Sequence, residues 1–330
     1  MSFFDFFPTP RFLLLSDTGI VISDRSIQIA EFREAYGSEQ KFSLVNCGEA
    51  LLPSGAVVSG SILNQEEVVK SLQEMREHYH LNFVHATLPE EKAYLFVTEF
   101  DRMPMEDLRD AVAFILEENV PLALAEAIFY FDVINPTAKN SKMKVAVSVL
   151  QEKDVKVYVD TFESAGITPV SFDIESQAIA RALILPGDTR TQLILNIQET
   201  KTGLYVVEDE VVQFSSTPSL GSRTNDKGYV DLANLKLEIR KLFSFWKTHL
   251  DKQGIPQRKI ERMLLVGEGA AKEDFVTELM SGIDAPYALA DVWANAFSIK
   301  KHLPEVTFET SLSYGAAIGA ALPDKEHIYV

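Results

Sequence analysis

Each half of the chain has the same order of predicted elements, and this repeat limits the possible folds more than any other feature of the sequence. In both halves, short β-branched strands are joined through a polar turn and are followed by alternating helices and strands. The first set comprises the predicted strands Arg11–Leu15, Gly19–Ile22 and Ser26–Phe32, followed by a further strand, Phe42–Leu51. The second set comprises Gln192–Ile197, Gly203–Val207 and Val211–Ser215. Sequence identity between the halves is negligible, so the repeat is one of structure, and it predicts two α/β lobes facing each other across a cleft.

Residues 90–165 follow a pattern of their own between the two repeats. Two helices and two further strands are predicted there after a strand over residues 93–100, and they are Met105–Glu118, Asp154–Ala165, Ala127–Ile134 and Lys144–Leu150. Gly166 ends the second helix. The sequence therefore predicts three parts: a first lobe of residues 1–89 plus 166–187, an inserted α+β subdomain of residues 90–165, and a second lobe of residues 188–330.

The charge of the chain limits its partners. It contains 31 lysines and arginines against 48 aspartates and glutamates, a formal net charge of −17. An acidic surface repels phosphate backbones, so we expect no nucleic-acid partner.

The longest helical candidate, residues 107–131, is interrupted by three glutamates and Pro121, so we expect no direct membrane insertion, which needs roughly 18 apolar residues. Cys47 is the only cysteine, which fits a reducing compartment.

Short motifs follow one another in a fixed order along nearly the whole chain. They lie at Phe7–Phe12, Gly19–Gln28, Leu52–Gly60, Ala86–Pro89, Phe172–Leu183, Glu238–Trp246, Leu265–Ala270 and Ser311–Gly319. In this order they resemble the PilM-like proteins of type IV pilus assembly, which share the fold of actin, Hsp70 and FtsA. The resemblance implies an α/β, actin-like (RNase H-like) fold of two lobes with a small α+β insertion.

The resemblance also implies a function and a location. A PilM-like protein is a cytoplasmic adaptor, peripheral to the cytoplasmic face of the inner membrane, and it binds the N-terminal cytoplasmic peptide of a PilN-like single-pass membrane protein. It thereby links the membrane alignment complex to the pilus motor ATPases, and it can form homo-oligomers. We predict that the peptide docks as an extended segment in the groove between the first lobe and the insertion, by pairing with a strand edge.

Two β-hairpins hold the phosphates of ATP in the fold that the sequence resembles, and both hairpins depart from the family pattern here. The first has Val21 where the family has an aspartate, and Gln28 where a basic residue usually follows. In the second, Asn196-Ile197-Gln198 replaces an aspartate and a glycine. A carboxylate that orients Mg²⁺ is a central part of phosphoryl transfer. We therefore expect a pseudo-ATPase with no catalytic residue, cofactor or metal.

The residues at the corresponding positions would form a vestigial nucleotide cleft. They are Ser23, Asp24, Arg25, Ser26, Asn196, Gln198, Gly221, Gly267 and Gly269. Between the last two glycines, Glu268 places a carboxylate near the path of an anionic ligand. ATP with Mg²⁺ remains an alternative ligand of this cleft.

Several alternatives stay open at this point. The chain could be an active ATP-hydrolysing member of the same fold, or an FtsA-like cell-division scaffold, although the polar residues 323–330 offer no amphipathic anchor. His78, His80 and His85 surround a helix end and favour a solvated helix terminus over a metal site. The phenylalanines among residues 3–7 are expected to pack on the first lobe. Gly315 and Gly319 predict a helix that packs closely against a sheet.

Overall fold

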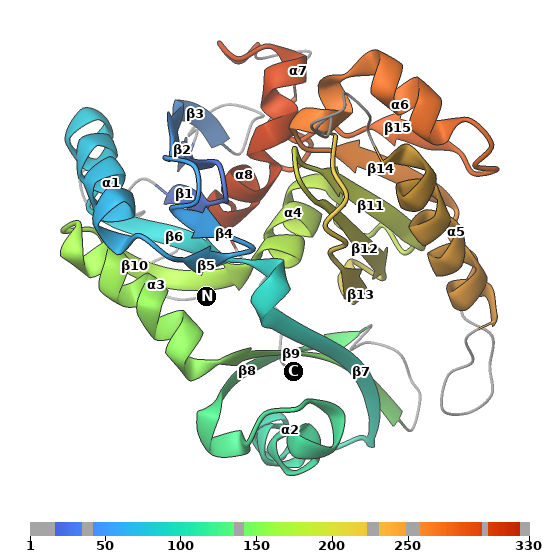
Figure 1. The fold of residues 1–330 in the computed structure, drawn as a ribbon. Helices are drawn as coiled ribbons and strands as arrows, with labels where there is room; N and C mark the ends of the chain where they lie inside the picture. The colour runs from blue at the N-terminus through green and yellow to red at the C-terminus, as the bar shows by residue number, and fades with distance from the viewer. Residues whose placement is uncertain are drawn as a thin grey trace, which may run out of the picture.

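The computed structural model describes residues 17–34, 42–134, 142–222, 231–248, 258–298 and 303–323. Two five-stranded sheets form the centres of two lobes, and a three-stranded sheet forms a separate layer at the bottom of the view in Figure 1. The predicted strand Arg11–Leu15 and the phenylalanines among residues 3–7 lie outside the described residues. The predicted residue ranges of the three parts stay a prediction.

The first sheet has the strand order β10-β6-β1-β2-β3. An antiparallel meander is formed by β1 (Asp17–Ile22), β2 (Ser26–Glu34) and β3 (Phe42–Leu51). Phe42–Leu51 is thus the third strand of the meander, and not an addition to it as the sequence pattern indicated. Two parallel strands, β6 (Phe83–Leu88) and β10 (Thr168–Ile174), extend the sheet on the other side of β1.

Two helices cover one face of this sheet, α1 (Gln65–Tyr79) and α3 (Glu152–Ser164). The start of α1 follows from its sequence, since the Asn64 side chain accepts a hydrogen bond from the backbone N–H of Glu67, as an N-cap residue does. Its end is set by His80, which adopts the left-handed conformation (φ 57°). Val68, Leu72 and Met75 form the buried face of α1.

The second sheet repeats the topology of the first. Its order is β13-β12-β11-β14-β15, with strands at Gln192–Ile197 (β11), Thr202–Glu208 (β12), Val211–Ser216 (β13), Arg262–Val266 (β14) and Tyr287–Leu289 (β15). In each sheet the first three strands are antiparallel and the last two are parallel to the first. Helices α5 (Leu232–Thr248) and α6 (Glu273–Met280) pack on it.

Two helices lie between the large sheets, α4 (Glu175–Leu183) and α8 (Gly315–Ala321), and α8 consists almost entirely of glycine and alanine. A Cβ atom added to Gly319 would meet the carbonyl oxygen of Ala178 at 1.7 Å, and one added to Gly19 in β1 would meet that of Ala317 at 1.9 Å. The predicted close packing of α8 against a sheet occurs at β1, whereas Gly319 itself packs against helix α4. This packing brings the two lobes into one continuous core.

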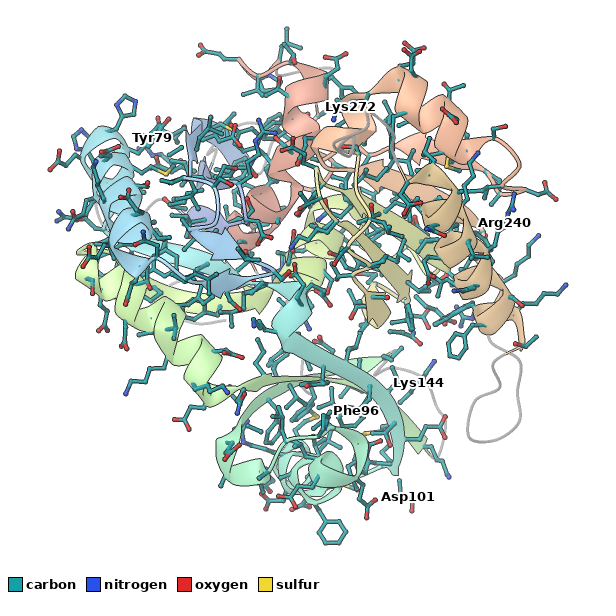
Figure 2. The ribbon with its side chains drawn as sticks, in the orientation of Figure 1. Tyr79, Phe96, Asp101, Lys144, Arg240 and Lys272 are labelled. Atoms are coloured by element: carbon teal, nitrogen blue, oxygen red, sulfur yellow. The ribbon has the colours of Figure 1, made fainter. Side chains whose placement is uncertain are left out.

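The insertion contains β7 (Ala93–Asp101), β8 (Ala127–Ile134) and β9 (Lys142–Gln151), with β9 in the middle. Helix α2 (Met105–Asn119) packs on one face of this sheet, over Val145, Val147 and Val149. Figure 2 shows Phe96 in this small core. The opposite face is turned toward the two lobes.

The remaining elements are short. They are β4 (Val57–Val58), β5 (Ser61–Ile62), η3 (Glu90–Lys92), η4 (Leu124–Glu126), η5 (Glu268–Ala271), α7 (Phe308–Ser311) and η6 (Leu312–Tyr314). The hairpin of β4 and β5 lies where the sequence predicted a loop, because strands of two residues leave no readable alternation.

Candidate functional site

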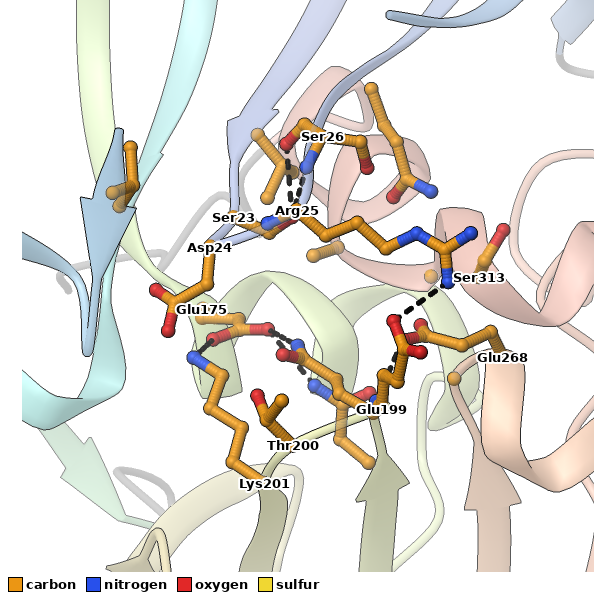
Figure 3. Close-up of a pocket in the computed structure, with 18 of the residues that line it drawn as sticks. Ser23, Asp24, Arg25, Ser26, Glu175, Glu199, Thr200, Lys201, Glu268 and Ser313 are labelled. Atoms are coloured by element: carbon orange, nitrogen blue, oxygen red, sulfur yellow. Dashed lines mark hydrogen bonds and ion pairs between the residues drawn. The ribbon is translucent and has the colours of Figure 1, made fainter. Parts of the chain in front are cut away.

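A cleft of about 910 Å³ lies between the lobes, where the turns of the two meanders approach each other. Figure 3 shows the β1–β2 turn on one side and the β11–β12 turn on the other. Of the predicted nucleotide residues, Ser23, Asp24, Arg25, Ser26, Asn196, Gln198 and Gly267 line the cleft. The structure thus brings seven of the nine together.

The other two predicted residues, Gly221 and Gly269, support the second turn from outside the cleft lining. A Cβ atom on Gly221 would meet the backbone of Glu199 at 2.4 Å, and one on Gly269 would meet the side chain of Ile197 at 2.4 Å. A Cβ atom on Gly267 (φ 90°) would likewise meet the carbonyl oxygen of Ile197 at 2.4 Å. Gly221 and Gly267 are therefore required by the approach of one backbone to another, and Gly269 by the approach of the Ile197 side chain.

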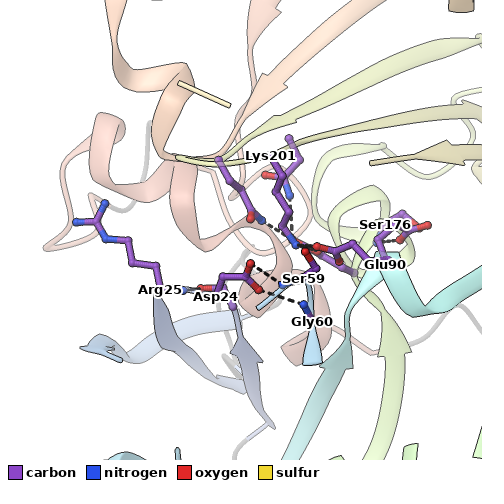
Figure 4. A network of polar contacts seen from close by, with 12 residues as sticks. Asp24, Arg25, Ser59, Gly60, Glu90, Ser176 and Lys201 are labelled. Carbon is purple, nitrogen blue, oxygen red and sulfur yellow. Dashed lines mark hydrogen bonds and ion pairs between the residues drawn. The ribbon is translucent and has the colours of Figure 1, made fainter. Parts of the chain in front are cut away.

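The polar groups of the β1–β2 turn form hydrogen bonds with other groups of the protein. The hydroxyl of Ser23 accepts a hydrogen bond from the N–H of Ser26 at 3.0 Å. The carboxylate of Asp24 accepts hydrogen bonds from the N–H groups of Ser59 (2.8 Å) and Gly60 (3.1 Å), as Figure 4 shows. Asp24 thus anchors the β4–β5 hairpin, which lies at the edge of the cleft.

The two turns are joined by an ion pair across the cleft. Arg25 donates a hydrogen bond to the carboxylate of Glu199 at 2.9 Å, and the N–H of Glu199 donates to Glu268 at 2.8 Å. The side chains of Arg25 and Glu199 are 55% and 32% exposed. Solvent screens such a pair, so it contributes at most about 1 kcal/mol.

A second, buried group of charges lies deeper in the cleft. Glu175, the first residue of α4, accepts hydrogen bonds from the side-chain amides of Asn196 (2.9 Å) and Gln198 (2.7 Å). The ammonium group of Lys201 lies 3.8 Å from the Glu175 carboxylate and 2.5 Å from the carboxylate of Glu91. Asn196 and Gln198, in the second hairpin, therefore bind a carboxylate of the chain itself.

Burial changes the protonation equilibria of this group. It raises the pKa of Glu175 to about 7, with Lys201 opposing the rise and Glu91 and Glu90 adding to it. Burial would lower the pKa of Lys201, but the charges of Glu175 and Glu91 outweigh it and raise that pKa above its ordinary value. Lys201 therefore stays charged, while Glu175 titrates near neutral pH.

The charged residues of the cleft that the site prediction missed are Glu91, Glu175, Glu199 and Lys201. A signal for two of them was present in the sequence, because Glu91 and Glu175 come soon after the strands β6 and β10. These strands are parallel, and the carboxyl ends of parallel strands meet at one edge of a sheet, where ligands tend to bind. Lys201 and Glu199 flank the tip of the second hairpin, and no local pattern indicates their partners.

The charges that line the cleft are mainly negative. Seven carboxylates face two cations, namely Asp24, Glu49, Glu91, Glu175, Glu199, Glu268 and Glu309 against Arg25 and Lys201. Both cations are already paired with carboxylates of the chain. A polyanion entering here would meet an excess of like charge, with no unpaired cation in the described lining to offset it.

A second cavity, of about 620 Å³, lies between the first lobe and the insertion. We call it the groove. It is lined from the insertion by β8 and β9, and from the first lobe by β6, β10, α4 and α3, the helix that packs on the first sheet, with the end of α8 at its border. Its apolar lining comprises Leu88, Ile128, Leu150, Val155, Phe172, Ile174 and Leu322. Ile128 and the neighbouring Tyr130 are 44% and 46% exposed.

Several polar side chains of the groove form hydrogen bonds with one another. Arg181 donates two hydrogen bonds to Asp173, at 2.7 and 2.8 Å. His85 lies 2.8 Å from the hydroxyl of Ser171. His85 is thus a residue of β6 that faces the groove, whereas His78 and His80 belong to the end of α1. No cluster suited to holding a metal ion occurs among the described histidines, cysteines and acidic residues.

Within the described ranges, none of the helices is both long and apolar enough to span a bilayer.

Comparisons with known proteins agree with the resemblance seen in the sequence. The family model described as type IV pilus assembly protein PilM matches residues 19–241. No curated protein sequence matches the chain. A solved structure of a PilM–PilN type IV pilus biogenesis complex superimposes with a TM-score of 0.77 at 17% identity, over 94% of this chain and 98% of that chain.

Ethanolamine utilization protein EutJ from Carboxydothermus hydrogenoformans superimposes with a TM-score of 0.52 at 11% identity, over 94% of this chain and 91% of that chain. At these identities the solved structures establish the fold alone, and the predicted actin-like, two-lobed α/β fold is confirmed. The family follows from the sequence match, which spans more than half of the residues. The chain belongs to the PilM family of type IV pilus assembly proteins.

Proposed function

We propose that this chain is a cytoplasmic adaptor of type IV pilus assembly that holds the N-terminal cytoplasmic peptide of a PilN-like membrane protein in the groove. In this role the protein lies at the cytoplasmic face of the inner membrane and connects the membrane-bound partner with the pilus motor. The observation that carries the proposal is the apolar groove between the first lobe and the insertion.

The shape of the groove favours an extended peptide. Among the described strands, β8 and β10 each end their sheet, and both contribute residues to the groove. A strand edge offers backbone groups to a peptide that adds as a further strand, while alternate side chains enter apolar pockets. The eight residues of β8 span about 26 Å, so they can pair with a peptide of similar length.

The residues that line the groove predict how tightly a peptide binds there and how strongly its binding depends on salt. Asp173 and Arg181 neutralise each other, and the Asp17 carboxylate at the border lies 4.0 Å from His85, so the rest of the groove offers mainly apolar surface and backbone hydrogen bonds. Ordering a short peptide costs entropy that offsets part of these contacts. We therefore expect a Kd in the micromolar range, on the order of −8 kcal/mol, with a weak dependence on salt.

The partner in the solved relative supports the proposal. That structure is a complex of PilM with PilN, and its PilM-type fold covers almost the whole of this chain. Membership of the same family makes a PilN-like protein the first partner to test.

Calorimetry tests the groove directly. The ligand is a synthetic peptide that spans the cytoplasmic N-terminal segment of a PilN-like protein from the same organism. Ile128→Ser should weaken binding about tenfold, since it removes apolar contact from an exposed position without disturbing the core. Phe114→Ser, on the outer face of α2 and 83% exposed, is the matched control and should bind as the wild type does. Absence of binding by the wild type, or equal loss in both variants, would rule the groove out.

We also propose that the chain does not hydrolyse ATP. The support is the excess of carboxylates in the cleft and the use of Asn196, Gln198 and Lys201 to hold Glu175. No phosphate release above background is expected with Mg²⁺ and ATP at about 1 mM, a typical upper KM. Metal-dependent turnover that disappears in Lys201→Ala or Asp24→Ala would contradict the proposal.

A further inference from the structure

Helix α4 borders both the cleft and the groove. Its first residue, Glu175, lines the cleft, whereas Gln177 and Arg181, further along the helix, line the groove. A change in the position of α4 therefore alters the two cavities together.

The segment that leads from β6 to β7 also contributes residues to both the cleft and the groove. Leu88 lines the groove and Glu91 lines the cleft. Glu90, between them, accepts a hydrogen bond at 3.0 Å from the N–H of Ser176, in the first turn of α4, as Figure 4 shows. Residues 88–91 and the start of α4 are thus held to each other.

Lys201 joins these two elements to the second lobe. It extends from the β11–β12 turn, and its ammonium group lies between the carboxylates of Glu91 and Glu175. The side chain of Lys201 is only 10% exposed, and those of its partners 14% and 7%. Such buried charges depend strongly on their partners, because each one left alone would be desolvated without compensation.

The packing of α4 would carry a displacement from one end of the helix to the other. Ala178 contacts the backbone of Gly319 in α8 too closely for a side chain to fit between them. Arg181 also donates a hydrogen bond to the carbonyl oxygen of Gly319 at 3.1 Å. The helix is therefore held against α8 as a rigid body, and its groove-lining residues follow the position of Glu175.

We propose that Lys201 is a positioning residue for the peptide groove. Through Glu175 and Glu91, it holds α4 and residues 88–91 in the arrangement that receives the peptide, although its own side chain does not line the groove. The inference rests on the proposed function, since it concerns the affinity of the same groove. The polar centre of the cleft then serves to shape a binding surface on the other side of α4.

The experiment compares three variants of the full chain with the same PilN-like peptide by calorimetry. Lys201→Met should weaken binding about tenfold, a typical coupling between two sites. Lys201→Arg keeps the charge and should bind within about threefold of the wild type. The control is Lys241→Met, which removes an exposed lysine of α5 and should leave the affinity unchanged.

Hydrogen exchange, measured without peptide, gives a second readout that does not depend on binding. In Lys201→Met, amides of residues 175–183 should exchange faster, while those of α2 in the insertion keep their protection. If Lys201→Met does not fold, Glu91→Gln replaces it, because Lys201 then still faces Glu175, and about threefold weaker binding is expected.

Two results would overturn the inference. One is wild-type affinity in a folded Lys201→Met or Glu91→Gln variant, which would show that the groove keeps its shape without this ion network. The other is an equal loss in Lys201→Met and Lys201→Arg. If the wild type itself does not bind the peptide, the proposed function is wrong, and the inference that rests on it is wrong too. If the wild type binds but one of these two results is obtained, only the inference is wrong.

Discussion

The surroundings of Glu175 contain groups that raise its pKa and groups that lower it. Burial and the nearby carboxyl groups of Glu91 and Glu90 favour its neutral form, whereas Lys201 and the amide donor of Asn196 favour its charged form. Burial prevails, and the pKa rises from 4.5 to about 7. The charge of Glu175 therefore changes near neutral pH.

This pKa predicts the direction of a pH effect on stability. Between pH 4.5 and about 7, folded Glu175 holds a proton that the unfolded chain releases. The free energy of unfolding should therefore fall as pH rises through this window, by an amount on the order of 3 kcal/mol, and Glu175 should add no further change above it. Glu175→Gln cannot titrate, so its stability should vary less with pH.

Urea unfolding at pH 5, 6, 7 and 8 measures this difference. Glu66→Gln, at an exposed position in the first turn of α1, is the control and should keep the wild-type slope. An identical pH dependence for the wild type and Glu175→Gln would show that Glu175 is ionised throughout, with its charge compensated by Lys201.

At the scale of elements, α8 shows how small residues allow the lobes to share a core. The helix is buried along its whole length and lies against both α4 and β1. Its glycines are unfavourable for helix formation by about 1 kcal/mol each. Close packing offsets this cost, because no other residue allows the two backbones to approach so closely.

Gly319→Ala should therefore destabilise the protein, although alanine is the better helix former. The added methyl group would overlap the carbonyl oxygen of Ala178, so α8 must move away from α4, with an expected loss of about 3 kcal/mol. Gly187→Ala is a useful comparison, because its surroundings are open and only its positive φ of 83° opposes the change. It should cost about 1 kcal/mol. Thermal unfolding that ranks the two variants the other way would contradict this account of α8.

At the scale of the whole molecule, two kinds of polar contact join the lobes across the cleft. The buried network around Lys201 is shielded from salt, whereas the pair of Arg25 and Glu199 lies at the surface. The shared core around α4 and α8 supplies the larger apolar contact. The surface pair therefore serves mainly to align the two turns.

A double-mutant cycle of Arg25→Met and Glu199→Gln should give a coupling energy of about 0.5 kcal/mol at low salt. Because solvent ions screen exposed charges, the coupling should vanish at about 1 M salt, where the Debye length is about 3 Å. A coupling above about 2 kcal/mol, or one that survives high salt, would mean that this pair holds the lobes together more strongly than its exposure indicates.

Much of the fold was predictable because its signals are local. The short β-branched segments of β1 and β2, the cap at Asn64 and the left-handed Gly166 (φ 76°) each depend on residues a few positions apart. The repeat of the two meanders followed from the same signals. β3 was assigned correctly as a strand, but its place in the meander depends on hydrogen bonds with β2, which its own pattern does not encode.

The amino-acid sequence by itself determined the order of the elements, the net negative charge and the uncharged side chains Val21 and Asn196 of the two hairpins, because these are properties of single positions and short windows. Only the tertiary structure decided which groups would meet. Lys201 reaches Glu91 across 110 positions, and the groove brings β8 together with β10. The physical reason is that such contacts arise from the packing of sheets and helices already formed, and the free energy that selects them is spread over the core.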